Sequence, residues 1–125
     1  MNRVVRSLRC VSIAVFLAAA LHAQTTGVIS GTVTDSSQAV IPGASVTVVN
    51  AETGVTVWHG QTNASGVYRA PELGVGKYNI VVDFQGFKRA AVNGIPLAVD
   101  QRASINVTME PGGTTETVTV IGETA

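Results

Sequence analysis

Apolar and polar residues alternate along most of the chain after residue 24, in short runs divided by turn-forming residues. The clearest run extends from Lys77 to Phe84, where Tyr78, Ile80 and Val82 occupy every second position. A period of two places the large apolar side chains on one face of a β-strand and the other side chains on the opposite face. Because no convincing helical period is found in this region, we expect an all-β domain.

Seven runs of this kind are separated by clusters of Gly, Pro, Asn, Asp and Ser. Short strands at this spacing predict a seven-stranded antiparallel β-sandwich of the immunoglobulin-like or transthyretin-like type, with Greek-key connections. The sixth run is the weakest and most polar, so we expect it at a sheet edge. The predicted strands are Val28–Asp35, Ala44–Asn50, Val55–Thr62, Val67–Ala70, Lys77–Phe84, Lys88–Asn93 and Arg102–Met109.

Two of the connections have recognisable turn chemistry. Pro42 presets φ at the second position of a turn and Gly43 accepts a positive φ at the third, which predicts a type II turn over residues 41–44. The sequence Asn-Ala-Ser-Gly at residues 63–66 is a hairpin signal, in which Gly66 takes the left-handed conformation.

The predicted core ends just after Met109. The Glu-Pro-Gly-Gly sequence at residues 110–113 breaks the alternation, which resumes weakly around Val118 and Val120. No further strand follows that could pair with these valines. We therefore expect residues 111–125 to form a linker or tail outside the core.

Residues 1–23 have the pattern of a secretory signal peptide. Three arginines precede an uncharged apolar run, Val11–Leu21, and the small residue Ala23 ends the segment. A run of eleven residues is too short to span a bilayer as a helix, which needs about 20. We expect cleavage after Ala23, with an uncleaved anchor as the alternative, and a domain over residues 24–110.

Charge and cysteine content exclude several classes of function for the exported chain. It has five basic and eight acidic residues, a formal charge of 5 − 8 = −3, and no clustered basic surface of the kind that binds nucleic acid. The single cysteine, Cys10, lies in the leader. No disulfide or thiolate chemistry is therefore expected in the domain, and its stability must come from the sheet core.

The sequence offers no catalytic, metal or cofactor site. His59 is the one histidine after the leader, whereas a metal site needs several converging ligands and a catalytic base needs an orienting partner. We interpret His59 as an ordinary strand residue. Serines and acids are present without a recognisable nucleophile and base, so we expect that the protein is not an enzyme and uses no cofactor.

Three aromatic residues are candidates for a ligand-stacking platform for a sugar or a peptide: Trp58, Tyr68 and Phe87. The alternative is that they fill the core, as aromatics in sandwiches more often do. Trp58 is the best candidate for exposure, because Val55 and Val57 would occupy the opposite, inward face of its strand.

Several short motifs together resemble the carboxypeptidase regulatory-like domain, over about Gly27–Met109. The resemblance implies a transthyretin-like or immunoglobulin-like sandwich that accompanies carboxypeptidases without being their catalytic part. It also implies structural roles for four residues, Gly66, Leu73, Gly76 and Tyr78. The motifs, in chain order, are Gly31-Thr32-Val33-x-Asp35, Pro42-Gly43-Ala44-x-Val46, Gly66-x-Tyr68, Leu73-x-x-Gly76-x-Tyr78 and Gly86-Phe87.

Tyr78 has a specific expected role. Leu73 and Tyr78 bracket a loop in which Gly76 permits a tight entry into the fifth predicted strand. We expect the Tyr78 ring to be buried and its hydroxyl to return to a nearby backbone group, as in the tyrosine corner of other sandwiches.

The order of segments is similar to the N-terminus of TonB-dependent outer-membrane receptors: a leader, one such domain, a Gly-Gly pair and the Val- and Thr-rich residues 116–120. This resemblance implies a periplasmic or outer-membrane location, with an outer-membrane transporter or periplasmic protein as partner. Membrane contact would come only through a C-terminal barrel, which residues 1–125 do not contain. The alternative is a free-standing secreted module that binds carbohydrate or mediates adhesion, with a glycan as ligand.

Overall fold

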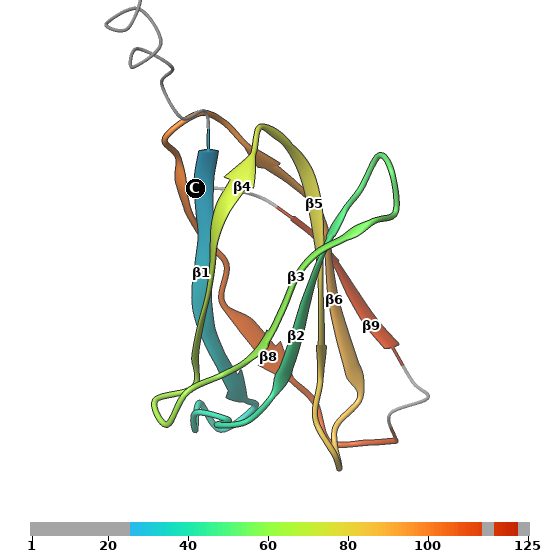
Figure 1. Ribbon diagram of the computed structural model, residues 1–125. Helices are drawn as coiled ribbons and strands as arrows, with labels where there is room; N and C mark the ends of the chain where they lie inside the picture. The colour runs from blue at the N-terminus through green and yellow to red at the C-terminus, as the bar shows by residue number, and fades with distance from the viewer. Residues whose placement is uncertain (1–25, 114–116, 123–125) are drawn as a thin grey trace, which may run out of the picture.

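The computed structural model describes residues 26–113 and 117–122 as two packed β-sheets (Figure 1). The predicted leader and its cleavage site lie outside the described residues. Within the two described ranges there is no helix of the length and apolar character needed to cross a membrane. The predicted all-β sandwich is confirmed.

Nine strands form the described part of the sandwich. β1, β2, β3 and β5 correspond closely to predicted strands, β4 continues four residues beyond its predicted end at Ala70, and the later strands differ in length, number or direction. Their bounds are β1 Thr26–Asp35, β2 Ser45–Asn50, β3 Thr56–Gln61, β4 Val67–Gly74, β5 Gly76–Asp83, β6 Arg89–Leu97, β7 Arg102–Ser104, β8 Val107–Met109 and β9 Thr117–Ile121.

One sheet has the order β4-β1-β7, with β8 also pairing with β1, and the other has the order β3-β2-β5-β6-β9. The predicted strand Arg102–Met109 is in fact two strands, β7 and β8, and both run parallel to β1. A third parallel pair joins β6 and β9. The predicted antiparallel sandwich of seven strands therefore has nine strands in the described residues, and three of its strand pairs are parallel.

The core lies between the inner faces of the two sheets and follows the predicted alternation. Ile29 and Val33 of β1, Val48 of β2, and Ile80 and Val82 of β5 have no exposed surface. Burying a side chain of this size stabilises the fold by roughly 1.5–3 kcal/mol. The period-two pattern therefore identified the inward face of each of these strands correctly.

The turn between β1 and β2 depends on a buried hydroxyl. Gly43 has φ of +76°, as the predicted type II turn requires. The Thr62 hydroxyl donates to the Ile41 carbonyl (2.6 Å) and accepts from the Ala44 N–H (2.9 Å). Thr62 is 5% exposed, so its one side chain satisfies two buried backbone groups of the turn.

The chain passes very close to β1 where β7 ends and β8 begins. A Cβ atom on Gly31 would lie 1.8 Å from the Ile105 carbonyl oxygen, so only glycine fits at this position. The Ile105 N–H donates to the Ser30 carbonyl (2.8 Å), and the Thr32 N–H donates to Asn106 Oδ1 (3.0 Å). Residues 105 and 106 thus interrupt the strand without leaving β1.

Two tyrosine hydroxyls bond to backbone carbonyls from buried rings. Tyr78 is 3% exposed and donates to the Gly74 carbonyl (2.6 Å), which confirms its predicted role. Tyr68, not predicted to act in this way, is 2% exposed and donates to the Ile105 carbonyl (2.6 Å). Burial raises the pKa of the Tyr68 phenol well above its ordinary value, so the hydroxyl keeps the proton that it donates.

The segment expected to be a tail contains a paired strand. β9 lies alongside β6 in the register Arg89↔Thr117 to Asn93↔Ile121, and the Gly122 N–H donates to the Asn93 carbonyl (Figure 1). β6 is therefore an inner strand, and its prediction as an edge was wrong. β9 pairs with a strand that precedes it in the chain, so the absence of a following strand does not make it a tail.

Substituting Gly31 tests the close approach of the two chain segments. We expect Gly31→Ala to destabilise the domain by about 3 kcal/mol or more, because neither backbone can move away without breaking the β1 pairing. Gly74→Ala is the control, since its Cβ would meet only the Tyr78 hydroxyl, at 3.8 Å. Urea unfolding followed by circular dichroism measures both. Equal unfolding midpoints for the two variants would contradict the close approach of Gly31 and Ile105.

Removing the tyrosine hydroxyls one at a time compares their two bonds. We expect Tyr68→Phe to cost about 1–2 kcal/mol, because it leaves the buried Ile105 carbonyl without that donor. Tyr78→Phe should cost about 1 kcal/mol or less, since its bond is only partly buried. The free energies of unfolding of both variants give the answer, and a larger loss for Tyr78→Phe would overturn this ranking.

Candidate functional site

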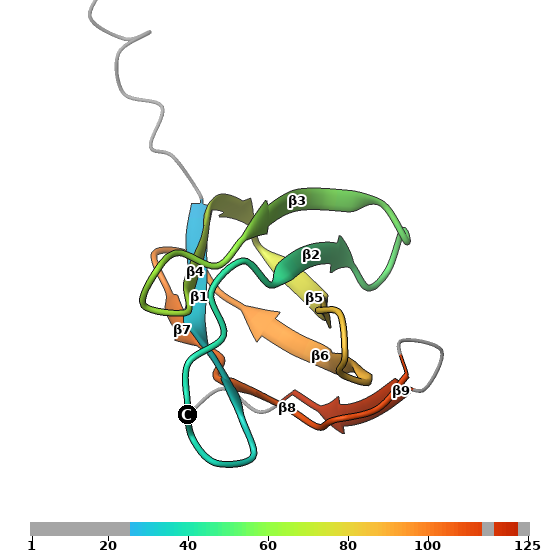
Figure 2. The ribbon, with the colours of Figure 1, turned by 90° about the horizontal axis from the view of Figure 1, so that it is seen from below.

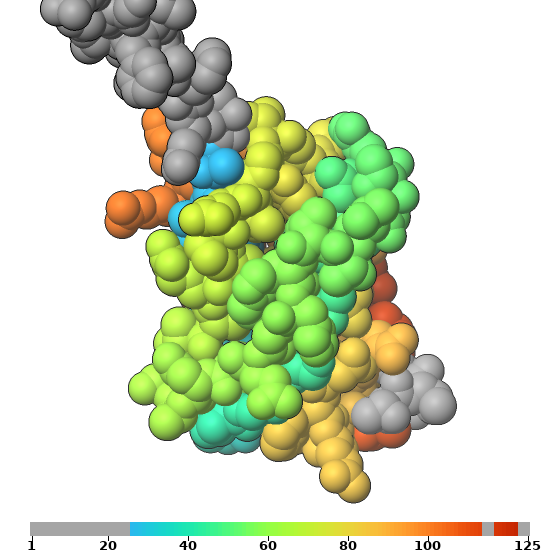
Figure 3. Space-filling model, viewed as in Figure 1, coloured from blue at the N-terminus to red at the C-terminus, as the bar shows by residue number. Residues whose placement is uncertain are grey.

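The sandwich is closed along one side and hollowed along the other. On the closed side β3 and β4, from different sheets, contact each other, and Figure 3 shows them side by side on one face of the molecule. On the opposite side, where β8 and β9 lie (Figure 2), a cavity of about 420 Å³ is present between the sheets. We call this cavity the β8–β9 groove.

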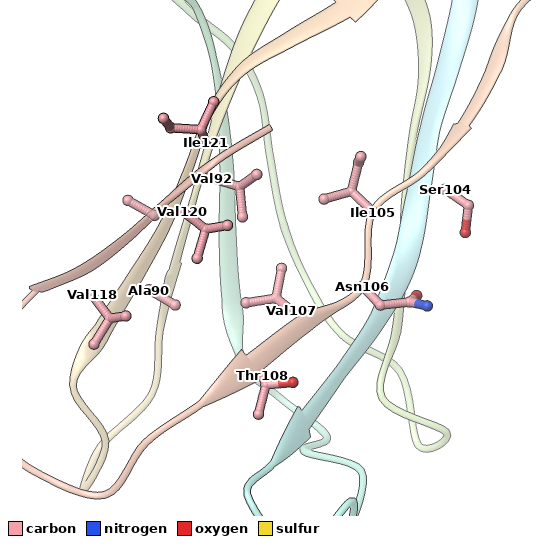
Figure 4. Close-up of a pocket in the computed structure, with 11 residues that line it drawn as sticks. Ala90, Val92, Ser104, Ile105, Asn106, Val107, Thr108, Val118, Val120 and Ile121 are labelled. Carbon is pink, nitrogen blue, oxygen red and sulfur yellow. The ribbon is translucent and has the colours of Figure 1, made fainter. Parts of the chain in front are cut away.

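Three segments line the β8–β9 groove with hydrocarbon side chains. Figure 4 shows side chains from β6 and β9 on one side of the space, and from β8 and the residues that join it to β7 on the other. The side chains of Ser104 and Asn106 point away from it. The apolar side chains in the space are Ala90, Val92, Ile105, Val107, Val118 and Val120.

Burial of these side chains is uneven across the groove. Val107 and Val92 are buried, with 4% and 8% exposure, whereas Val120 is 55% exposed and Val118 is half-buried. β9 thus presents apolar surface that the rest of the domain covers only partly. Such a surface gains free energy when a further apolar group covers it.

Backbone edges flank the same groove. Among the described residues β8 pairs with β1 alone, and β9 pairs with β6 alone. Each strand therefore has one edge without a strand partner. Unpaired N–H and C=O groups at a sheet edge are able to accept another strand.

The three aromatic candidates do not form a common surface. Tyr68 is 2% exposed within the core, so neither face of its ring is available. Phe87 is half-buried and packs against Phe84, with ring centroids 6.0 Å apart. Trp58 is also half-buried and packs against the core.

The expected orientation of Trp58 was wrong. Trp58 pairs directly with Val48 and therefore points to the same, inward face. Between the pairs Val48↔Trp58 and Val49↔Thr56 the register shifts by one residue, which changes the faces occupied by the residues before Trp58. Val55 and Val57 are exposed (58% and 42%). The sequence contains no signal for this bulge.

The four residues of the family motif take structural positions. Gly66 has φ of +73°, as predicted, and a Cβ there would lie 2.8 Å from the Cβ of Val40. Leu73 is 3% exposed in the core. Gly76 begins β5 opposite Leu97, and a single residue separates it from the end of β4.

His59 lies on the outer face of β3, opposite Thr47. Its Nδ1 atom is 3.0 Å from the Thr47 hydroxyl oxygen, and the side chain is exposed. Within the part of the chain that the structure describes, no three His, Cys, Asp or Glu side chains are grouped so that they could hold a metal ion.

Polar side chains at the turns are occupied with local structure. The pKa of the Asp35 carboxyl lies below its usual value, chiefly because it accepts a hydrogen bond from the Ser37 hydroxyl (2.6 Å). Asp35 also accepts from the N–H groups of Ser37 and Ala39. Asn63 likewise caps its own turn by accepting from the N–H groups of Ser65 and Val67.

The sequence motifs and the sandwich agree with a family assignment. The profile of the carboxypeptidase regulatory-like domain matches residues 28–110, from within β1 to just past β8. The chain belongs to this family. No curated protein is similar enough in sequence to count as a relative.

Solved structures of other proteins share the fold of this regulatory-like domain at low sequence identity. The Bacillus anthracis TIE protein has a TM-score of 0.57 and 22% identity, over 70% of this chain and 17% of its own. A streptococcal ancillary pilin gives 0.54 and 13%, over 72% and 34%. Catechol 1,2-dioxygenase from Acinetobacter radioresistens gives 0.56 and 13%, over 78% and 58%. The chain therefore spans less than two thirds of each of these proteins.

The position of Trp58 can be tested by fluorescence, because it is the one tryptophan in the chain. We expect partial shielding of the indole from acrylamide. A Cβ on Gly60 would lie 2.6 Å from the indole ring, so Gly60→Ala should push the ring outward, increase quenching, and cost about 1 kcal/mol of stability. Gly54→Ala, with no atom within 4 Å, is the control for quenching. Unchanged quenching in Gly60→Ala would contradict this packing.

Proposed function

We propose that this regulatory-like domain is a non-catalytic interaction domain of an exported protein. The observation that carries the proposal is the family match over residues 28–110, since this domain type accompanies catalytic or transport domains without performing their chemistry. The described polar groups support it, because the Asp35 and Asn63 side chains cap turns and the Tyr68 and Tyr78 hydroxyls bond to carbonyls.

We further propose that the domain is the N-terminal accessory part of a TonB-dependent outer-membrane receptor and lies on the periplasmic side of the membrane. This finer proposal is supported by the order of leader, domain, Gly-Gly pair and Val- and Thr-rich segment. β9 belongs to that segment, so the domain would be joined to a following plug through a strand of its own sheet. Its partner would be the transporter itself or a periplasmic protein.

A free-standing secreted module for carbohydrate binding or adhesion is the second candidate. Two pilus proteins share the fold, a streptococcal ancillary pilin and the group B streptococcus pilus 2b backbone protein, which favours a role at a cell surface. The buried ring of Tyr68 leaves Trp58 and Phe87 as the remaining aromatic candidates for a glycan. Adhesion through protein contacts is therefore the stronger form of this alternative.

Reading the gene and its transcript beyond the codon for Ala125 distinguishes the two candidates. We expect an in-frame or frameshifted continuation that encodes a plug and amphipathic barrel strands. Fractionation of cells that express the natural gene should then place the product in the outer membrane. A stop codon followed by unrelated sequence, with the product in the medium, would reject the receptor role and favour the secreted module.

A further inference from the structure

We propose that the β8–β9 groove binds a short extended peptide segment, which adds to the free edge of β8 and inserts alternate valine or isoleucine side chains into the cavity. The inference rests on the proposed function as an interaction domain and names the surface and the class of partner. It does not depend on whether that domain belongs to a receptor.

The size and lining of the groove fit a few aliphatic side chains. An apolar cavity of about 150 Å³ accepts one group of the size of benzene. The 420 Å³ of the β8–β9 groove therefore has room for two such groups. Ala90, Val92 and Val107 offer them hydrocarbon contact without a charged group in the lining.

The free edge of β8 provides the backbone contacts. β8 pairs in parallel with β1 at Val107, Thr108 and Met109, and no other strand of the described chain pairs with it. In a paired strand alternate residues direct their N–H and C=O groups to either side, so part of the β8 backbone faces outward. A peptide placed there would gain sheet hydrogen bonds while its alternate side chains enter the groove.

The chain itself indicates which side chains the groove accepts. Val118 and Val120 of β9 are two residues apart and lie beside Ala90 and Val92, their register partners on β6. Their neighbour Thr119 pairs with Ala91 and lies on the other face. A partner with the same Val-x-Val spacing and uncharged residues between would match the lining of the groove, which contains no charged residue.

The dimensions favour a peptide over a second folded copy of the domain. β8 has three residues, which correspond to a length of about 10 Å. A stable interface between folded proteins buries about 800 Å² on each partner. An edge of this length beside a single cavity offers far less contact. A short peptide, in contrast, can pair with the edge of β8 and place its side chains in the cavity.

The test uses residues 24–125, the chain expected after removal of the leader, and a fluorescein-labelled peptide. The peptide is Thr-Val-Thr-Val-Ile, the sequence of β9. We expect saturable binding by fluorescence anisotropy. The same peptide with alternate N-methylated amides should bind at least tenfold more weakly, because it keeps the side chains but cannot complete the sheet hydrogen bonds. Hydrogen exchange should show added protection at alternate amides of β8, those that face its free edge, and unchanged protection in β9.

Variants of the domain test the cavity separately from the edge. Ala90→Leu fills the groove, so we expect an affinity loss of at least tenfold with an unfolding midpoint equal to or above that of the parent. Val120→Thr changes an exposed groove residue without altering its shape and should weaken binding several-fold without affecting folding. Thr119→Leu, on the other face of β9, is the matched control and should leave the affinity within twofold.

Three results would overturn the proposal. Absence of binding at millimolar peptide excludes the groove as a peptide site. Equal binding of the N-methylated peptide means that the cavity holds apolar groups without strand pairing. Loss of protection in β9 means that the peptide replaces β9 on β6 instead of adding to β8. None of these results alters what the gene encodes after Ala125, so failure here is distinguishable from failure of the receptor proposal.

Discussion

The contact between the Ile105 carbonyl and the backbone of Gly31 is the constraint on which the rest of the sandwich depends. β1 is the strand around which the first sheet is built, since β4, β7 and β8 all pair with it. The chain keeps both parallel pairings only because residue 31 has no side chain to separate it from Ile105. The Tyr68 hydroxyl of β4 also donates a hydrogen bond to the Ile105 carbonyl, so β4 is connected to the same position.

The same interruption shapes the groove. Residues 105 and 106 lie between β7 and β8, and the Asn106 amide oxygen accepts from the Thr32 N–H on the side away from the cavity. Ile105 and Val107 point the opposite way, toward Val92 and Val120. A backbone feature required for the fold therefore also determines which side chains are presented at the open side of the sandwich. Changes at Gly31 should thus affect the groove as well as stability.

The sequence predicts what is local and misses what depends on distant pairing. The inward faces of β1, β2 and β5 were predicted because the direction of a side chain in a strand is set by its own position in the alternation. β9 was missed because Val118 and Val120 pair with residues 28 positions earlier. The inward direction of Trp58 follows from its pairing with Val48, and no residue in the sequence marks the bulge that lies just before it in β3.

The candidate site was less predictable than the fold. Each valine that lines the groove is visibly apolar in the sequence, but β6, β8 and β9 come together only through the sheet order. Tyr78 and Tyr68 both belong to the quoted motifs, yet the sequence predicted a structural hydroxyl bond for Tyr78 alone. Tyr68, with an equally short bond, was a candidate for ligand binding. An aromatic residue in a strand gives the same local signal in both roles, and only its neighbours in the fold distinguish them.

The peripheral position of β9 has a mechanical consequence. Tension applied to the chain after Gly122 acts first on the β6–β9 pairing, because β9 follows every other described strand and only one of its five residues is even half-buried. Detachment of five residues would lengthen the connection by about 17 Å. The pairings among β1 to β8 would remain intact. The edge of β6 and the side chains of Ala90 and Val92 would become accessible. The domain would thus convert a pull at its end into a change in exposed binding surface before its core is disturbed.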